Sequence, residues 1–447
     1  MRWQVLVVLG VVAACSSDND APAAPSGATK NGPDASAPGS SSSSSGAADR
    51  PDGGPASRFV DTCALAAATC SPATVGEGSG LAEIDRCAYA LNESADIAVT
   101  PDVVTKLGTI AAPVTVTDVL NDANRIATKT ATVPGAPSSV QYALNWQDDD
   151  NGSVAWTPQG LSGSADASDD GKVGGKTAVL VSFYDEPVAG SGEENVGVRI
   201  AFVDTTNAAA PRYRFALLVQ PKAGAAGAPS FDPIKIHAGG MVWYRDWLYV
   251  ADTTHGFRVF DMRRLLRVAT DAGPFGCDGT ACRAGNYKYV LPQIGKYEHE
   301  SACGPLFSWV SLDRRSDPPA LVSGEYCSTD ACAGPLAGRV FRWPLDPTTG
   351  LLRSAVTFPT EAYLMSHKQV QGGASVNGLY FLSSSAPSGD GGDLYRVTKG
   401  KSATSQWGDN PEDLMVDPGN GWLWSLNEKA GKRAVFAVKL DAYPAPL

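Results

Sequence analysis

A repeat of short elements constrains the fold of this chain more than any other feature of its sequence. Each copy begins with a Gly- or Pro-containing motif, continues with an aromatic-rich strand and ends with a strand of basic and aromatic residues. Units of three or four antiparallel strands repeated in this way are typical of the blades of a β-propeller. The start motifs are Pro158-Gln159-Gly160-Leu161, His237-Ala238-Gly239-Gly240-Met241, Gln371-Gly372-Gly373-Ala374 and Pro411-Glu412-Asp413-Leu414.

The repeat predicts an all-β fold with units near 157–220, 237–294, 306–358, 368–405 and 410–440. This count gives five blades, with six as the alternative. The last unit lacks one strand, which Ser138–Asn145 could supply to close the ring. A β-sandwich would not explain the repeated start motif. A parallel α/β fold would need long amphipathic helices between the strands, and the pattern contains none.

The N-terminal residues 1–15 have the pattern of an export signal. Arg2 precedes an apolar run, Val5–Val12, that is too short to span a bilayer. The run continues as Ala13-Ala14-Cys15, which resembles a bacterial lipobox and implies that Cys15 is acylated. Ser16 at the next position implies sorting to the outer membrane, at its periplasmic face or at the cell surface. An ordinary signal peptide with an incidental cysteine is the alternative.

Composition divides the rest of the chain into three segments. Residues 16–57 lack Val, Ile, Leu, Phe, Met, Trp and Tyr and contain an unbroken serine run, so we predict a disordered tether. We expect a small helical preface over 58–137, linked by disulfides, and the propeller over 138–447. The short helices expected in the preface lie at 64–68, 81–91 and 117–127.

Eight cysteines follow Cys15, an even number that indicates disulfides in an exported chain. Cys277 with Cys282 and Cys327 with Cys332 are each separated by four residues and could close small loops. The remaining four, of which one is expected to join the preface to the propeller, are Cys63, Cys70, Cys87 and Cys303. A zinc site is the alternative, but no histidine stands at a ligand interval from either close pair.

Two strand patterns resemble known propeller families. Tyr249-Val250-Ala251-Asp252-Thr253 with Arg258-Val259-Phe260-Asp261 is similar to blades of NHL and SMP-30/gluconolactonase-like proteins. Pro411-Glu412-Asp413-Leu414 with Val416-Asp417 is similar to a blade start of the same group. The stretch Trp156–Val438 also resembles secreted bacterial propeller proteins of unassigned function. The resemblance implies the fold and no particular activity.

The start motifs also predict a site. Equal positions in a radial repeat lie at equal heights around the axis, so polar residues of the start motifs should gather at one mouth of the channel. Amides, carboxylates and one imidazole suit a polar ligand such as a carbohydrate, or a cation. Side chains that merely satisfy backbone groups are the alternative interpretation. The candidate ligand-binding residues are Gln159, His237, Glu325, Gln371, Glu412 and Asp413.

Two further motifs could hold a metal ion. Asp166, Ser168 and Asp170, followed by Gly171, match the opening of a calcium loop. Thr177 stands where the bidentate Glu of such a loop belongs, so a solvated turn is the alternative. Glu298-His299-Glu300, beside Cys303, could contact a metal or form a polar loop.

These observations favour a tethered lipoprotein that binds a polar ligand, with calcium as the one cofactor to consider. A metal-dependent propeller hydrolase or lactonase, using Glu325, Glu412 or Asp413, and an envelope protein–protein scaffold are the alternatives. The sequence leaves open whether the chain is an enzyme. A formal net charge of −11 argues against a nucleic-acid partner. No serine-hydrolase elbow, HExxH motif, P-loop or GxGxxG motif occurs.

The lipobox predicts that Cys15→Ala releases the protein from the membrane fraction without unfolding it. Acyl chains on Cys15 would supply the anchoring, and the tether would insulate the folded domain from that residue. Fractionation of cells followed by immunoblotting measures the release, and circular dichroism of the variant checks its fold. Retention of the variant in the membrane pellet would show that the anchor lies elsewhere.

Overall fold

The computed structural model describes residues 63, 75–76, 78–187, 194–224, 227–300, 303–327, 338–385 and 391–446. All of them belong to one compact unit, Phe59–Leu447. The predictions for the signal, Cys15, the tether, the helix at 64–68, Cys70 and Cys332 fall outside the described residues.

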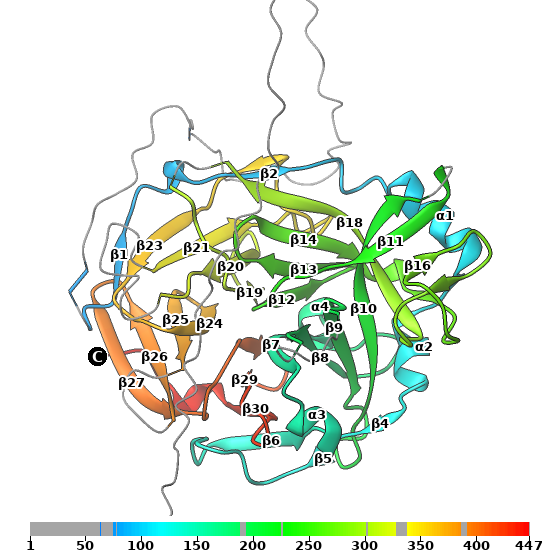
Figure 1. Ribbon diagram of the computed structural model, residues 1–447. Coiled ribbons are helices and arrows are strands. Elements are labelled where there is room, and N and C mark those ends of the chain that lie inside the picture. Colours follow the sequence, from blue (N-terminus) through cyan, green and yellow to red (C-terminus); the bar gives the residue numbers. More distant parts are fainter. Residues whose placement is uncertain are drawn as a thin grey trace, which may run out of the picture. The chain divides into compact units, whose positions relative to one another are not determined.

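Antiparallel meanders dominate the unit, and the chain is a β-propeller, as the repeat predicts (Figure 1). In each meander the first strand lies near the centre and the later strands lie farther out. Two meanders share the largest sheet. They are β7 (Trp156–Gly163), β8 (Ala178–Asp185), β9 (Val198–Asp204) and β10 (Arg212–Ala223), and β12 (Met241–Tyr244), β13 (Trp247–Asp252), β14 (Gly256–Asp261) and β18 (Tyr289–His299).

Three further sheets contain one meander each. The first is β19 (Trp309–Asp313), β20 (Ala320–Gly324), β21 (Arg339–Pro344) and β23 (Glu361–Met365). The second is β24 (Val370–Val376), β25 (Leu379–Ser384), β26 (Gly392–Thr398) and β27 (Lys401–Trp407). The third is β28 (Met415–Asp417), β29 (Trp422–Leu426) and β30 (Ala434–Lys439).

The last meander is completed from the N-terminal side, which confirms the predicted closure. Strand β6 (Val140–Asn145) pairs antiparallel with β30, with Leu144 opposite Val435. A single sheet therefore contains strands from both ends of the propeller, and unfolding either end breaks this pairing.

The basic and aromatic strands of the repeat are not edge strands, since each pairs with another strand on both sides. Strand β14 pairs with both β13 and β18, and β21 pairs with both β20 and β23. Their arginines bind buried carboxylates: Arg258 Nε lies 2.7 Å from Asp252, and Arg342 Nη1 lies 2.8 Å from Asp313. The basic residues therefore neutralise acids inside the sheets. The third unit also continues to Met365, beyond the predicted end at 358.

The segment before the propeller is less helical than predicted. The helix expected at 81–91 is wrong: β1 (Leu81–Glu83) pairs with β23, the 3₁₀-helix η2 (Arg86–Ala88) follows, and β2 (Leu91–Glu93) pairs with β18. The helix expected at 117–127 is shorter, α2 (Val116–Asn121): it starts after a capping box of Thr115 and Asp118 and ends at Asn121. Helix α1 (Asp102–Ile110) was not predicted. This segment adds strands to the outside of existing sheets (Figure 1).

The remaining elements are short. The helices are α3 (Asp148–Gly152), α4 (Ser164–Ala167), η4 (Met262–Arg264) and η5 (Leu440–Ala442). The strands are β3 (Ala112–Pro113), β4 (Arg125–Ile126), β5 (Thr128–Lys129), β11 (Pro229–Pro233), β15 (Leu266–Arg267), β16 (Gly276–Cys277), β17 (Cys282–Arg283) and β22 (Val356–Thr357). None of the helices in the described part of the chain is long and apolar enough to cross a membrane.

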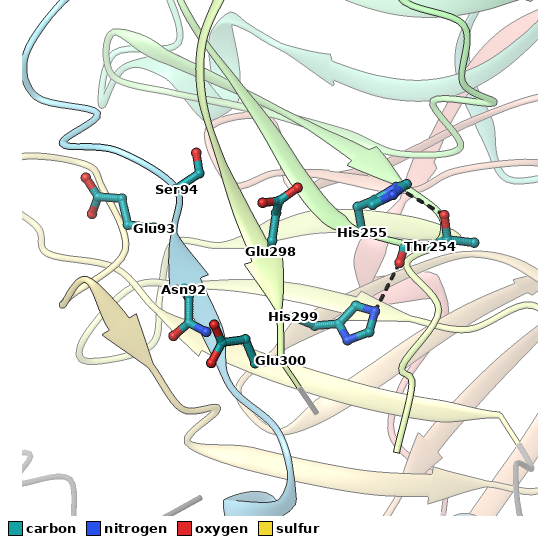
Figure 2. A pocket seen from close by; sticks show the side chains of 8 residues that line it. All are labelled: Asn92, Glu93, Ser94, Thr254, His255, Glu298, His299 and Glu300. Carbon is teal, nitrogen blue, oxygen red and sulfur yellow. Dashed lines mark hydrogen bonds between the residues drawn. The ribbon is translucent and has the colours of Figure 1, made fainter. Parts of the chain in front are cut away.

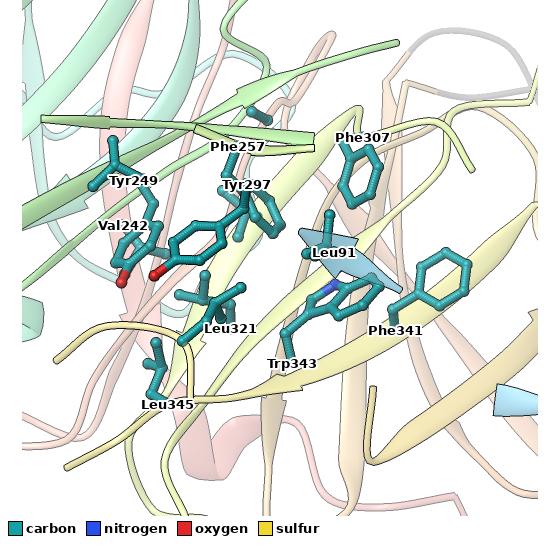
Figure 3. Close-up of a cluster of buried hydrophobic side chains, with 14 of the residues drawn as sticks. Leu91, Val242, Tyr249, Phe257, Tyr297, Phe307, Leu321, Phe341, Trp343 and Leu345 are labelled. Atoms are coloured by element: carbon teal, nitrogen blue, oxygen red, sulfur yellow. The ribbon is translucent and has the colours of Figure 1, made fainter. Parts of the chain in front are cut away.

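Aromatic side chains fill the space between neighbouring meanders. In the cluster of Figure 3, Leu91 of β2 lies among Phe307, Phe341 and Trp343. The Phe341 and Trp343 rings are 5.5 Å apart, and the Phe307 and Trp343 rings 6.1 Å. Strand β2 is thereby anchored by its own apolar residue as well as by backbone hydrogen bonds, since burial of a leucine side chain contributes about 1.5–3 kcal/mol.

Disulfides form at the positions where both partners are described. Cys277 and Cys282 are bonded, as their spacing predicts, and Cys63 is bonded to Cys87 within the N-terminal segment. Cys303 and Cys327 are also in disulfides. The predicted bridge between the preface and the propeller stays a prediction.

Glycines let the innermost strands approach each other closely. A Cβ atom on Gly240 would lie 2.2 Å from the backbone nitrogen of Val310, and one on Gly372 would lie 2.5 Å from Asp413 Cα. A Cβ on Gly160 would lie 3.0 Å from the Ala238 carbonyl oxygen. The glycines of the start motifs thus allow backbone-to-backbone packing around the axis.

We expect Gly240→Ala to destabilise the fold by about 1–3 kcal/mol or more, because backbone atoms of β19 cannot move away from the added methyl group without opening the ring. Gly152→Ala is the control, since a Cβ at Gly152 meets nothing within 4 Å. Urea unfolding followed by tryptophan fluorescence measures both variants. Equal stability of the two variants would contradict close packing at the axis.

Candidate functional site

The start motifs gather at one end of the propeller axis. Gln159 lies in β7, His237 precedes β12, Gln371 lies in β24, and Glu412 and Asp413 precede β28. The close approaches of Gly160 to Ala238 and of Gly372 to Asp413 place these segments against their neighbours. We call this group the start-end cluster; it also includes Glu428, Tyr184 and Glu186, which the following paragraphs place.

Gln159 is paired with a carboxylate that the sequence did not single out. Its Nε2 amide donates to Oε2 of Glu428 at 3.0 Å and to the Pro158 carbonyl at 3.3 Å. Burial raises the pKa of Glu428 to about 7, against the opposing effects of Arg433 and of the Gln159 hydrogen bond. Near neutral pH this partly exposed carboxyl group therefore exchanges between an acceptor and a donor form.

Gln371 forms a second amide–carboxylate pair. Its Nε2 donates to Oε1 of Glu412 at 3.1 Å. Glu412 is 1% exposed, and its Oε2 has no hydrogen-bond partner in the part of the chain that the structure describes. Burial, reinforced by the charges of Glu428 and Asp413, raises the pKa of Glu412 well above its ordinary value. The protonated form is thereby favoured, and it would carry a proton that can be donated.

Asp413 ties neighbouring strands together. It is fully buried, and its Oδ2 accepts a hydrogen bond from the Leu161 backbone amide of β7 at 2.9 Å. Burial raises the pKa of Asp413, while the backbone amides of Leu161, Leu414 and Met241 act in the opposite direction. Because its bonded partner is a backbone amide of β7, Asp413 connects neighbouring innermost strands.

His237 stands at the exposed margin of the cluster. Its ring centroid lies 4.7 Å from that of Tyr184, and the Tyr184 hydroxyl donates to Glu186 at 3.2 Å. Neighbouring atoms desolvate the imidazole and lower its pKa, although the Glu186 charge opposes this effect. Desolvation thus outweighs the carboxylate, and the neutral form of His237 is favoured at neutral pH.

Glu325, the remaining candidate, is bound to an arginine. It follows β20, the second strand of its meander, and forms a buried pair with Arg339, with Oε1 at 2.6 Å from Nη2 and Oε2 at 2.7 Å from Nε. The Leu306 backbone amide also donates to Oε1 at 2.7 Å. Both carboxylate oxygens of Glu325 are therefore engaged in structural bonds.

The residues proposed for calcium have other hydrogen-bond partners in the structure. Asp166 lies in α4 and is buried, with Oδ2 accepting from the Ser162 hydroxyl at 2.7 Å. Ser168 instead donates to Asp170 at 2.9 Å and to the Lys172 carbonyl at 2.7 Å, which forms a local turn. Burial raises the pKa of Asp166 to about 7. Within the described ranges no group of three His, Cys, Asp or Glu residues is arranged to hold a metal ion.

A separate pocket of about 390 Å³ lies where β14, β18 and β2 meet (Figure 2). His255 and His299 line it together with Glu298 and Glu300. The His299 Nε2 atom lies 3.0 Å from the Thr254 carbonyl oxygen, and the His255 Nδ1 atom 3.0 Å from Asp252. These contacts hold both rings in a polar loop.

Sequence reasoning missed Glu428, Tyr184 and Glu186 because it followed only the first strand of each unit. Tyr184 lies near the end of β8, and Glu428 lies just after β29. Strands β8 and β29 are the second strands of their meanders. An antiparallel second strand returns to the end where the first began. The residues after each aromatic-rich strand were therefore the signal that could have identified them.

No family model matches the sequence, and a search of the curated proteins finds no match. Solved structures give remote likenesses. A GH43_1 enzyme from Xanthomonas citri in complex with xylotriose is 10% identical and has a TM-score of 0.29, covering 76% of this chain and 93% of its own. RS223-beta-xylosidase is 10% identical with a TM-score of 0.31, covering 64% and 92%. Pseudomonas fluorescens PhoX in complex with vanadate is 10% identical with a TM-score of 0.32, covering 74% and 98%.

The raised pKa of Glu428 predicts a pH dependence of stability. A carboxyl group whose pKa is higher in the folded protein holds its proton more tightly there, so folding becomes less favourable as the pH rises from about 4.5 to about 7. Glu428→Gln removes this contribution. We expect the variant to lose less thermal stability than the wild type between pH 5 and pH 8 and to differ little at pH 4.

Differential scanning calorimetry across this pH range measures the effect. Glu300→Gln is the matched control, because Glu300 is exposed. If the Glu428→Gln and wild-type melting temperatures fall in parallel from pH 5 to pH 8, the carboxyl group is not desolvated in the way described.

Proposed function

We propose that this chain is a membrane-anchored, extracytoplasmic propeller lipoprotein that binds a polar, carbohydrate-like ligand at the start-end cluster. One observation carries the proposal: two amide–carboxyl pairs, Gln159 with Glu428 and Gln371 with Glu412, come from different meanders and meet at one end of the axis.

Sugar hydroxyl groups donate and accept hydrogen bonds together, and these pairs offer both functions. A glutamine side chain has two amide donors and one carbonyl acceptor, and a carboxyl group near its pKa supplies either role. Each glutamine uses Nε2 in its carboxylate bond, and both Gln371 and Glu428 are partly exposed. A hydroxyl group inserted beside either pair can therefore find a partner of the required kind.

The Tyr184 and His237 rings add an apolar surface beside these polar groups. Both side chains retain contact with solvent, and their centroids are 4.7 Å apart. The carbon–hydrogen face of a sugar ring can pack against such rings while its hydroxyl groups reach the glutamines. Desolvation keeps His237 neutral, which suits an uncharged ligand better than a cationic imidazole would.

The anchoring part of the proposal rests on the sequence of residues 1–57. A lipobox at Cys15 followed by a tether without large apolar residues would hold the propeller outside the inner membrane, with the outer membrane indicated by Ser16. The Cys15→Ala experiment tests this part independently of ligand binding.

The alternatives receive less support from the site. A metal-dependent hydrolase or lactonase would need Glu325, Glu412 or Asp413 for an ion, and hydrogen bonds already engage both oxygens of Glu325 and one of Asp413. Calcium at Asp166, Ser168 and Asp170 would require these side chains to leave their present partners. A protein–protein scaffold would not need the amide–carboxyl pairs.

We expect Gln159→Ala and Gln371→Ala each to weaken binding of neutral oligosaccharides by about tenfold, because each removes one hydrogen-bonding side chain and releases its carboxyl partner. Isothermal titration calorimetry with xylotriose, cellotriose and maltotriose measures the affinities. Gln406→Ala is the matched control, since Gln406 is exposed on the outermost strand β27.

Unchanged affinity in both site variants would place the ligand elsewhere. The absence of any binding heat at millimolar concentration for the three sugars would contradict the carbohydrate assignment.

A further inference from the structure

A second cavity, of about 630 Å³, lies at the opposite end of the inner strands. Its lining includes residues that follow the ends of β7, β12 and β19: Ser168 and Lys172 after β7, Arg245 after β12, and Arg314 after β19. The start-end cluster lies where these strands begin, so the two sites are separated by the length of the strands. We call this second cavity the strand-end pocket.

The strand-end pocket is basic although the whole chain is acidic. Four cationic side chains line it, Lys172, Arg245, Arg263 and Arg314, against two carboxylates, Asp169 and Asp246. The lining therefore carries a net charge of +2 (4 − 2), in a protein whose formal net charge is −11. A local positive field of this kind draws an anion toward the pocket.

Two of the four cations are already neutralised. Arg263 Nη1 lies 2.9 Å from Asp246, and its Nε lies 2.8 Å from Asp261. Arg314 pairs with Asp169 and donates to the Asp166 carbonyl. Arg245 and Lys172 are exposed, and no carboxylate in the described ranges forms an ion pair with either side chain. These two are the cationic side chains of the lining without an ion pair among the described residues, although hydrogen bonds and then the Lys172 charge lower the pKa of the neighbouring Asp170.

The backbone at Arg245 is unusual for an arginine. Arg245 and Asp246 form the two-residue turn between β12 and β13, and Arg245 has φ of 55°, in the left-handed region. Asn, Asp and Gly are the residues that adopt this conformation at least cost in such turns. The backbone amide of Arg245 donates to the Ala167 carbonyl at 3.2 Å, which fixes the backbone from which the cationic side chain extends.

An aromatic ring and buried donors complete the pocket. The Tyr244 ring has the Arg314 guanidinium 5.4 Å from its centroid and that of Arg245 5.7 Å away, which restricts both cations. Trp243 Nε1 and Arg314 Nε are buried donors with no acceptor among the residues that the structure describes. Two residues of the lining thus keep a donor group without an acceptor in the described part of the chain.

We propose that the strand-end pocket binds a small organic phosphate. A phosphate monoester carries about −1.5 to −2 charge at neutral pH, which matches the two unpaired cations, whereas a single carboxylate would neutralise only one of them. Its oxygens accept hydrogen bonds from guanidinium and ammonium groups. The volume of the cavity leaves room for the organic part beside Tyr244 and Met262. This site is independent of the carbohydrate-like ligand proposed at the start-end cluster.

Calorimetric titration with glycerol 3-phosphate at low salt tests the proposal, with glycerol as the uncharged control ligand. We expect the phosphate ester to bind and glycerol not to bind. Arg245→Gln and Lys172→Gln should each weaken the affinity for glycerol 3-phosphate by about tenfold or more, because each removes a charge-assisted bond. Lys172 lies on an exposed turn, so its variant keeps the test valid even if Arg245→Gln unfolds.

Arg212→Gln, an exposed arginine on β10, is the matched control and should bind like the wild type. Absence of binding to the wild type, or equal affinity in the Lys172→Gln and Arg212→Gln variants, would overturn the proposal. Gln159→Ala should leave the affinity for the phosphate ester unchanged; a loss there would also contradict a separate site.

Discussion

The close approach of the innermost strands is the constraint on which the rest of this structure depends. At Gly240 the backbone of β19 comes so near that a Cβ atom would lie 2.2 Å from a backbone nitrogen, and Gly372 stands in a similar relation to Asp413. Strands this close leave no room for side chains between them at that height. Polar side chains of the same motifs are therefore displaced toward the end of the axis, where they meet.

Buried charges are the second consequence of this geometry. Carboxylates that the tight centre removes from water must be paired, bonded to backbone amides or protonated. Glu325 is paired with Arg339, and Asp413 accepts the Leu161 amide. Glu412 has one unpartnered oxygen and a strongly raised pKa. Glu325 is thus fully engaged by its partners, whereas Glu412 and Asp413 each keep one oxygen without a hydrogen bond among the described residues.

The two ends of the axis have opposite chemistry. Carboxyl and amide groups occupy one end, with Glu428 and Gln371 as the partly exposed members. Turns after the strands occupy the other, where Arg245 and Lys172 supply positive charge. The parallel arrangement of the inner strands explains this separation, because all beginnings face one way and all ends the other. In this way the two ends of one propeller can offer surfaces of different chemistry to different ligands.

The sequence alone determined the class of fold, the ring closure by β6 and the Cys277–Cys282 disulfide, because these follow from local repeats and short spacings. It also singled out Gln371 and Glu412 through their equal positions in the repeat, and the structure joins these two by a hydrogen bond. Tertiary structure decided their partners. Glu428 reaches Gln159 across 269 residues, and Glu325 is taken up by Arg339. The N-terminal segment, expected to be helical, pairs with sheet edges that exist only once the propeller has folded. Periodicity in one segment reports that segment's own conformation, and cannot report which distant strand offers it hydrogen bonds.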